Sequence, residues 1–155
     1  MPSWKRAITI EIPGVPHAKA RPRFVANGRH RASVYTDTRT KQYEQSVAWH
    51  VAAMTRSQLL APAGTPVRVD IVAMYPRPKR LNRPKDPDGP IPKCNRTHGD
   101  LDNHIKCILD GINQSGLWED DGQVQCIRAE SLYVEKGQRP RSRVMVFLPT
   151  QDKTT

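Results

Sequence analysis

Two segments of the chain alternate apolar and polar residues, and each predicts a strand with one buried face. They run from residue 7 to 12 and from residue 67 to 75, and successive side chains of a strand point to opposite sides. In the second segment the apolar positions on one face are Val67, Val69, Ile71 and Ala73. Later segments, 124–133 and 144–148, predict two more strands, and residues 34–35 are expected to form a short hairpin with 23–25.

Two other segments have the period of an amphipathic helix. The first is expected from about Thr38 to Leu60, capped by Thr36 or Asp37. Its core-facing stripe is predicted to be Tyr43, Val47, Val51 and Met54. The second covers 101–114, and its apolar row consists of Leu101, Ile105, Ile108, Leu109 and Ile112. The opposite, polar row contains Asn103, Lys106, Asp110 and Asn113.

These elements predict an α+β fold, with strands and helices mixed in one small domain. A chain of 155 residues can bury a core without disulfides or metals to hold it together. The domain is expected to span 1–150, followed by a short polar tail at 151–155. Residues 76–97 contain six Pro and seven Lys or Arg against two Asp, a composition that predicts a mobile cationic loop.

Charge is distributed unevenly along the chain. The formal net charge is +10, and residues 1–99 hold 18 Lys and Arg against 6 Asp and Glu, whereas residues 100–155 hold 7 against 9. Such an excess of positive charge favours polyanions, mainly nucleic acid, through phosphate neutralisation and release of counterions. A solvated basic surface without a ligand is the alternative.

Two stretches present the cations most openly. Residues 17–31 contain five Lys or Arg and no acid, and Pro16 and Pro22 favour an extended loop or edge ribbon there. The other stretch is the loop at 76–97. The residues predicted to contact DNA phosphates are Lys19, Arg21, Arg23, Arg29, Arg31, Lys79, Arg80 and Arg83. Ordinary solvated loops remain the alternative for both stretches.

Against this basic background, one short segment concentrates acid. Between Asp100 and Asp121 there are six carboxylates and a single basic residue, Lys106. Asp100 and Asp102 are expected at the start of the second helix, and a strand that reverses direction could bring Asp121 toward them. Gathered carboxylates repel one another, and a divalent ion such as Mg²⁺ or Mn²⁺ relieves that repulsion and supports phosphodiester cleavage.

Lys106 follows Asp102 by one helical turn, where it could neutralise developing charge or orient a nucleophile. Simple helix capping by Asp100 and Asp102, with a solvated acidic turn at Glu119 to Asp121, is the alternative. His104 is expected to be a partly buried or surface helix residue and not a ligand.

Composition also argues against several other classes of protein. Three widely separated Cys residues without a Cys-x-x-Cys pair disfavour a disulfide frame or a zinc site. No apolar run is long enough for a membrane helix, and the N-terminus lacks an apolar signal core. A cytoplasmic location without a membrane is therefore expected.

The acidic segment resembles the signature of the RusA family of Holliday-junction resolvases. The matching residues are Asp100-Leu-Asp-Asn-x-x-Lys106, Leu109-Asp110-Gly-Ile-Asn and Gly116-Leu-Trp-Glu-Asp-Asp121-Gly-Gln-Val124, and Gly14-x-Pro16-x-x-Lys19-x-Arg-Pro-Arg23 is similar to the family's basic entry segment. The resemblance implies a bacterial or prophage-encoded, Mg²⁺-dependent endonuclease. It would act as a homodimer on four-way DNA junctions, with paired nicks, in recombination and repair.

By the same resemblance, the catalytic and metal-binding carboxylates would be Asp100, Asp102 and Asp121, with Lys106 in support. The long loop at 76–97 and the tail after residue 148 depart from the short family pattern. A non-catalytic DNA-binding module and a metal nuclease acting on flaps or other branched DNA remain as alternatives.

Overall fold

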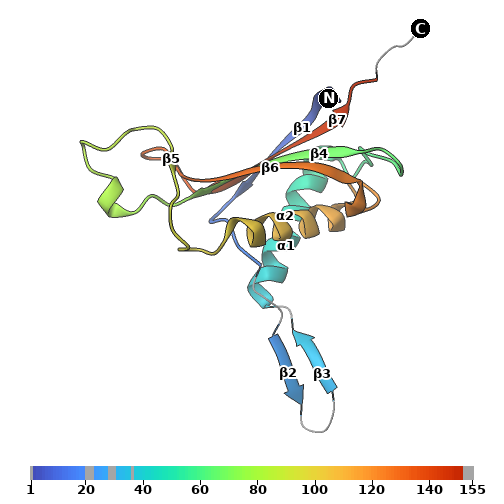
Figure 1. Ribbon diagram of the computed structural model, residues 1–155, viewed down its shortest axis with the longest axis horizontal. Coiled ribbons are helices and arrows are strands. Elements are labelled where there is room, and N and C mark those ends of the chain that lie inside the picture. Colours follow the sequence, from blue (N-terminus) through green and yellow to red (C-terminus); the bar gives the residue numbers. More distant parts are fainter. Residues whose placement is uncertain (1, 20–22, 28–30, 36, 152–155) are drawn as a thin grey trace.

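The computed structural model describes residues 2–19, 23–27, 31–35 and 37–151. The strands are β1 (Trp4–Pro13), β2 (Arg23–Asn27), β3 (Arg31–Tyr35), β4 (Val67–Tyr75), β5 (Ile91–Pro92), β6 (Val124–Tyr133) and β7 (Arg141–Pro149). The helices are α1 (Thr38–Thr55) and α2 (Leu101–Ser115), with 3₁₀ turns η1 (Lys79–Leu81) and η2 (Asp121–Gln123). The predicted α+β class, with a mixed sheet and two main helices, is confirmed (Figure 1).

Five strands form the main sheet in the order β1-β7-β4-β6-β5. Strands β4 and β6 are parallel, and the other neighbouring pairs are antiparallel. A parallel pair needs a crossover connection, and α2 supplies it between β4 and β6. Both helices lie on one face of the sheet, and α2 runs alongside β6 in the opposite direction (Figure 1). The start of α2 therefore lies near the end of β6.

The core lies between the sheet and the helices. The four positions predicted to face it from β4 are at most 1% exposed, which confirms that alternation. The first three pack with apolar residues of both helices and with the segment after α2, chiefly Val47, Val51, Ile108, Ile112 and Trp118. Ala73 belongs to a smaller cluster with Tyr75 and Tyr133. None of the described helices is long and apolar enough to cross a membrane.

Helix α1 ends five residues earlier than predicted. Arg56 has a φ of 53°, in the left-handed region, and its backbone N–H bonds to the carbonyl of Ala52. The chain then turns so that the N–H groups of Leu60 and Ala61 both reach the carbonyl of Leu117. The prediction that Met54 faces the core is wrong, because that side chain is 58% exposed.

Helix α2 begins at the predicted residue and buries a slightly different face. Its buried residues are His104, Cys107, Ile108, Gly111 and Ile112, whereas Ile105 and Leu109 are only partly buried. Gly111 lets α1 and α2 approach closely, since a Cβ there would lie 2.6 Å from that of Val47. His104 is fully buried, and so the prediction of a partly buried or surface residue is wrong.

The predicted hairpin is present as β2 and β3, which pair Arg23 with Tyr35 and Phe24 with Val34. These strands form their own two-stranded sheet, which projects beyond the N-terminal end of α1 (Figure 1). The segment 76–97 contains η1 and the short strand β5. Within this segment, which the sequence predicts to be a mobile cationic loop, Ile91 and Leu81 pack against Tyr75 and Tyr133.

Candidate active site

Asp100 and Asp102 lie at the exposed N-terminal end of α2. Asp100 occupies the N-cap position, but its side chain makes no capping hydrogen bond; its carbonyl accepts one from the His104 N–H at 3.2 Å. The Asp100 carboxylate is 48% exposed and lies 3.7 Å from the Nε of Arg96. Asp102 is exposed, and no described residue forms an ion pair with it. Both carboxylates therefore remain available to a ligand.

Lys106 stands one turn after Asp102 on the outward face of the helix. It is exposed, and within the described ranges it forms no ion pair or hydrogen bond. Residues four apart in a helix are neighbours on its surface. Lys106 can therefore place a positive charge beside whatever group the two aspartates bind.

Other cations line the approach to Asp100. The open hollow beside α2's first residues is lined in part by Lys93, Arg96 and Ser131, the last of these near the end of β6. Lys93 lies over the Tyr75 ring, with Nζ 4.9 Å from the ring centroid, and burial lowers the pKa of its ammonium group. Positive charge thus lies close to both aspartates.

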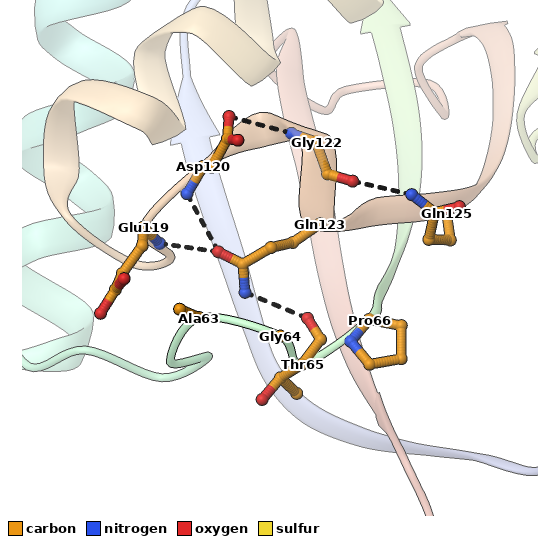
Figure 2. A pocket seen from close by; sticks show the side chains of 9 residues that line it. All are labelled: Ala63, Gly64, Thr65, Pro66, Glu119, Asp120, Gly122, Gln123 and Gln125. Atoms are coloured by element: carbon orange, nitrogen blue, oxygen red, sulfur yellow. Dashed lines mark hydrogen bonds between the residues drawn. The ribbon is translucent and has the colours of Figure 1, made fainter.

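Asp121 lies on a rigid acidic turn, residues 119–122, after the other end of α2. The Oε1 of Gln123 accepts hydrogen bonds from the N–H groups of Glu119 and Asp120 at 3.0 and 2.9 Å, and its Nε2 donates to the carbonyl of Thr65 (Figure 2). The same Nε2 also donates to the carbonyl of Pro62. The pKa of the Asp120 carboxyl is lowered, chiefly by the hydrogen bond that it accepts from the Gly122 N–H. A hydrogen bond with Asp121 is the second cause. This turn and residues 63–66 together line an open hollow of about 740 Å³.

Within one chain, Asp121 does not approach Asp100 and Asp102. A helix of 15 residues separates them, about 22 Å at 1.5 Å per residue. The described ranges contain no group of three or more His, Cys, Asp or Glu residues that could hold a metal ion. The expectation that the reversing strand would unite the three aspartates in one chain is therefore wrong. The strand does return, but it brings Ser131 and not Asp121 to the start of α2.

The predicted DNA-contact residues have different surroundings. Arg21 and Arg29 fall outside the described residues, and Arg23 and Arg31 lie on the strands of the projecting hairpin. The Nζ of Lys19 lies 2.6 Å from Asp110 and 3.2 Å from Glu44, so internal carboxylates match its charge.

The remaining three predicted contacts lie in the segment 76–97. Lys79 and Arg80 are exposed on η1. The Arg83 side chain is 53% exposed and lies 3.3 Å from Asp86. These cations face solvent, where a phosphate backbone could reach them.

Arg77, which the sequence did not single out, organises this segment. Its guanidinium donates to the carbonyls of Val134 and Leu81, each at 3.0 Å, to that of Pro87 at 2.6 Å, and to that of Gly89. The five N–H donors of a planar guanidinium group allow one side chain to hold several backbone segments together. No local pattern distinguishes Arg77 from the other cations of the segment, because three of its four acceptors lie ten or more positions away.

Comparison with models of protein families matches residues 13–147 to the family described as endodeoxyribonuclease RusA. The chain belongs to the RusA family. RusA-family enzymes are Holliday-junction-resolving nucleases, and they generally depend on a divalent metal ion. The matched range includes α2, the acidic turn and the whole segment 76–97. Curated proteins gave no significant match to the chain.

Proposed function

We propose that this RusA-family nuclease is a homodimeric, Mg²⁺-dependent resolvase that cuts four-way DNA junctions by paired nicks during recombination and repair. The observation that carries the proposal is the family match over residues 13–147. The exposed carboxylates of Asp100 and Asp102 at the start of α2 support it.

The donor set at the start of α2 suits a hard cation. Mg²⁺ is usually held by one or two carboxylates, with water and substrate phosphate completing its shell. Asp100 and Asp102 offer two carboxylates that no capping bond occupies, and Mn²⁺ would accept the same oxygen ligands. Once bound, such an ion lowers the pKa of water and stabilises charge on a phosphodiester.

Lys106 and the helix itself would act on the substrate. The scissile phosphate gains negative charge as the attacking oxygen approaches, and a nearby ammonium group stabilises that charge. Lys106 stands free on the same outward face as Asp102, and the partial positive charge of the helix N-terminus adds to its effect. We assign Asp121 to the same catalytic site by its place in the family motif.

The exposed cations of the segment 76–97 would position the junction arms. Arg96 is 92% exposed and stands beside Asp100, and Lys79 and Arg80 extend the basic surface along the same segment. Contacts of this kind bind the phosphate backbone without regard to sequence and weaken as salt is added. A two-fold dimer would present two such surfaces to the matched arms of a junction.

The proposal is tested with labelled four-way, flap and linear duplex DNA of shared sequence, incubated with Mg²⁺ and with EDTA. We expect symmetric nicks in the four-way junction alone, lost with EDTA and restored by added Mg²⁺. Equal cutting of flaps would contradict the junction preference. Binding without any cleavage, at any divalent ion tested, would contradict the enzymatic role of the acidic residues.

A further inference from the structure

The turn at residues 96–99, between β5 and α2, holds His98 in an unusual backbone conformation. The φ of His98 is 72°, in the left-handed region. Residues other than Gly seldom adopt it, and Asn, Asp and His do so more often than the rest. The Gly99 N–H donates to the carbonyl of Arg96 at 2.8 Å and closes the turn. Backbone strain of this kind is concentrated at functional sites.

This turn places the His98 ring against the ring of Tyr75. The two ring centroids are 5.6 Å apart and the ring planes differ by 23°, which is a stacked arrangement. Tyr75 is the last residue of β4 and is fully buried, whereas His98 is exposed. One side of the imidazole therefore rests on a buried ring, and the rest of it faces solvent.

Tyr75 contributes its ring to this arrangement and not its hydroxyl group. The hydroxyl is buried and has no hydrogen-bond partner among the described residues. The ring supports His98, and the ammonium group of Lys93 also lies over it. The π-face of an aromatic ring attracts both other rings and cations. Tyr75 is thus a support that fixes the position of the exposed imidazole.

The exposed imidazole stands next to the candidate metal site. His98 precedes Asp100 by two residues, which is at most about 7 Å of chain. Arg96 is 92% exposed and lies 3.7 Å from Asp100, and together with Lys93 it lines the open hollow beside α2's first residues. These cations suit a phosphate group. A nucleotide whose phosphate enters the hollow would carry its base to within reach of His98.

We propose that the solvent-facing side of His98 stacks on a nucleobase that has left the helical stack beside the scissile phosphate, with Tyr75 supporting it from beneath. The inference rests on the proposed function and adds a base-binding subsite to it. Stacking on a flat ring tolerates any sequence, because every base has a π-face. The subsite would therefore respond to whether a base can leave the stack and not to which base it is.

Such a subsite favours branched DNA over linear duplex. Taking a base out of a duplex costs unstacking and unpairing energy, and the cost is least where the base is already poorly stacked or unpaired. Helical stacking is interrupted at the branch point of a junction, whereas in linear duplex both neighbours hold every internal base. The stacked pair of His98 and Tyr75 would thus contribute to structure selectivity without any base-specific hydrogen bond.

A double-mutant cycle between the protein and the DNA tests the stacking. An abasic site is placed in turn at each nucleotide of one strand within two positions of the branch point, and the dissociation constant of each junction is measured in EDTA. We expect one abasic position to weaken wild-type binding about tenfold. His98→Asn keeps a residue type that tolerates positive φ but lacks the ring. This variant should bind the intact junction about tenfold more weakly and lose nothing further at that position.

Two further variants serve as controls. Tyr75→Phe removes only the unpaired hydroxyl, and it should keep the wild-type sensitivity to the abasic site. Lys79→Met removes an exposed cation of η1, and it should change the affinities for intact and abasic junctions by the same factor. A Tyr75→Phe variant without the sensitivity would assign the effect to the hydroxyl and contradict the stacking.

The outcomes separate this inference from the proposed function. If His98→Asn and the abasic sites act independently at every position while the wild type cuts junctions in Mg²⁺, the stacking is refuted and the function stands. If the two changes are coupled at one position but the wild type cuts no DNA at any divalent ion tested, the base-binding subsite stands and the proposed function is refuted.

Discussion

Lys19 places its ammonium nitrogen 2.6 Å from the Oδ2 of Asp110, and so ties the segment after β1 to the middle of α2. The same nitrogen lies 3.2 Å from Glu44 on α1, whose side chain is only 8% exposed. Desolvation alone would lower the pKa of Lys19, but hydrogen bonds to Asp110 and Glu44 raise it overall. A cation shared by two carboxylates in this way holds three segments together.

Replacing Lys19 should therefore affect folding more than DNA binding. We expect Lys19→Met to lower the free energy of unfolding by about 2–4 kcal/mol, because it leaves Glu44 without its cation in a largely buried place. Urea denaturation measures this change. Lys41→Met, at an exposed lysine of α1, should alter stability by less than about 0.5 kcal/mol. Similar losses for both variants would contradict the structural role of Lys19.

Asp102→Asn should separate cleavage from binding. We expect at least about 10³-fold slower nicking, since a neutral amide holds a divalent ion poorly. Affinity for the junction should be unchanged or higher, because a negative charge near the phosphates is removed. Nicking rates and gel-shift affinities measure the two effects. Asp88→Asn serves as the control, because this carboxylate is 96% exposed on the segment 76–97. This variant should cleave the junction at the wild-type rate.

Lys106→Met should slow the chemical step without weakening binding. A single positive charge aimed at the reacting group contributes about 10²–10³-fold to rate. Single-turnover cleavage at saturating enzyme measures that step, and Lys106→Arg should recover part of the rate. Lys85→Met, at an exposed lysine of the segment 76–97, should leave it unchanged. If Lys106→Met cleaves at the wild-type rate at saturating enzyme and more slowly only at low enzyme concentration, Lys106 acts in DNA binding and not in the chemical step.

Arg77→Lys should loosen the segment 76–97 while preserving net charge. An ammonium group cannot reach four carbonyls in the geometry of the guanidinium fork. We expect faster hydrogen exchange of amides between residues 78 and 90 and roughly five- to tenfold weaker junction binding. Arg39→Lys makes the same chemical change at an exposed residue of α1 and should alter neither the exchange nor the binding. Unchanged exchange in Arg77→Lys would mean that other contacts order the segment.

His104 should make the protein sensitive to acid. Its Nδ1 lies 3.0 Å from the carbonyl of His17 and its Nε2 3.3 Å from the Ser142 hydroxyl, and burial lowers its pKa to about 4 from 6.5. Because the folded-state pKa is depressed, the unfolded chain binds the proton first. The stabilising effect is complete above pH 6.5 and is lost as the pH falls from 6.5 to about 4.

The loss over that interval amounts to about 3 kcal/mol, from 1.36 kcal/mol for each pH unit. Urea denaturation at several pH values measures it. We expect His104→Gln to be less stable at neutral pH but to lose less stability between pH 6.5 and 4 than the wild type. His98→Gln, at an exposed histidine, should keep the wild-type dependence of the unfolding free energy on pH. If both variants lose equally little stability between pH 6.5 and 4, the effect does not come from His104.

The regular elements were largely predictable from local pattern. Strands β4 and β6 have their predicted limits because apolar alternation stops at turn-forming residues on each side. The end of α1 was missed because residues 56–60 contain neither Gly nor Pro. The chain that leaves the left-handed turn at Arg56 is held instead by the bonds from Leu60 and Ala61 to the carbonyl of Leu117. Long-range packing decided that boundary.

The candidate site was only half predictable. Motif spacing locates Asp100, Asp102 and Lys106, since a single helix fixes how those residues lie. It cannot locate Asp121 relative to them, because that depends on where the strand after α2 begins. The partners of Lys19 and Arg77 could not be predicted from the sequence either. Lys19 and Asp110 lie 91 positions apart, and Arg77 and Val134 lie 57 apart.

The proposed homodimer has a consequence for how activity depends on the amount of protein. If only the dimer cuts junctions, the number of working sites obeys mass action and depends on the dissociation constant of the dimer. Well below that constant, the cutting rate should then fall with the square of the total protein concentration. Dilution would then silence the nuclease reversibly, and junction DNA that gathers two chains would restore it.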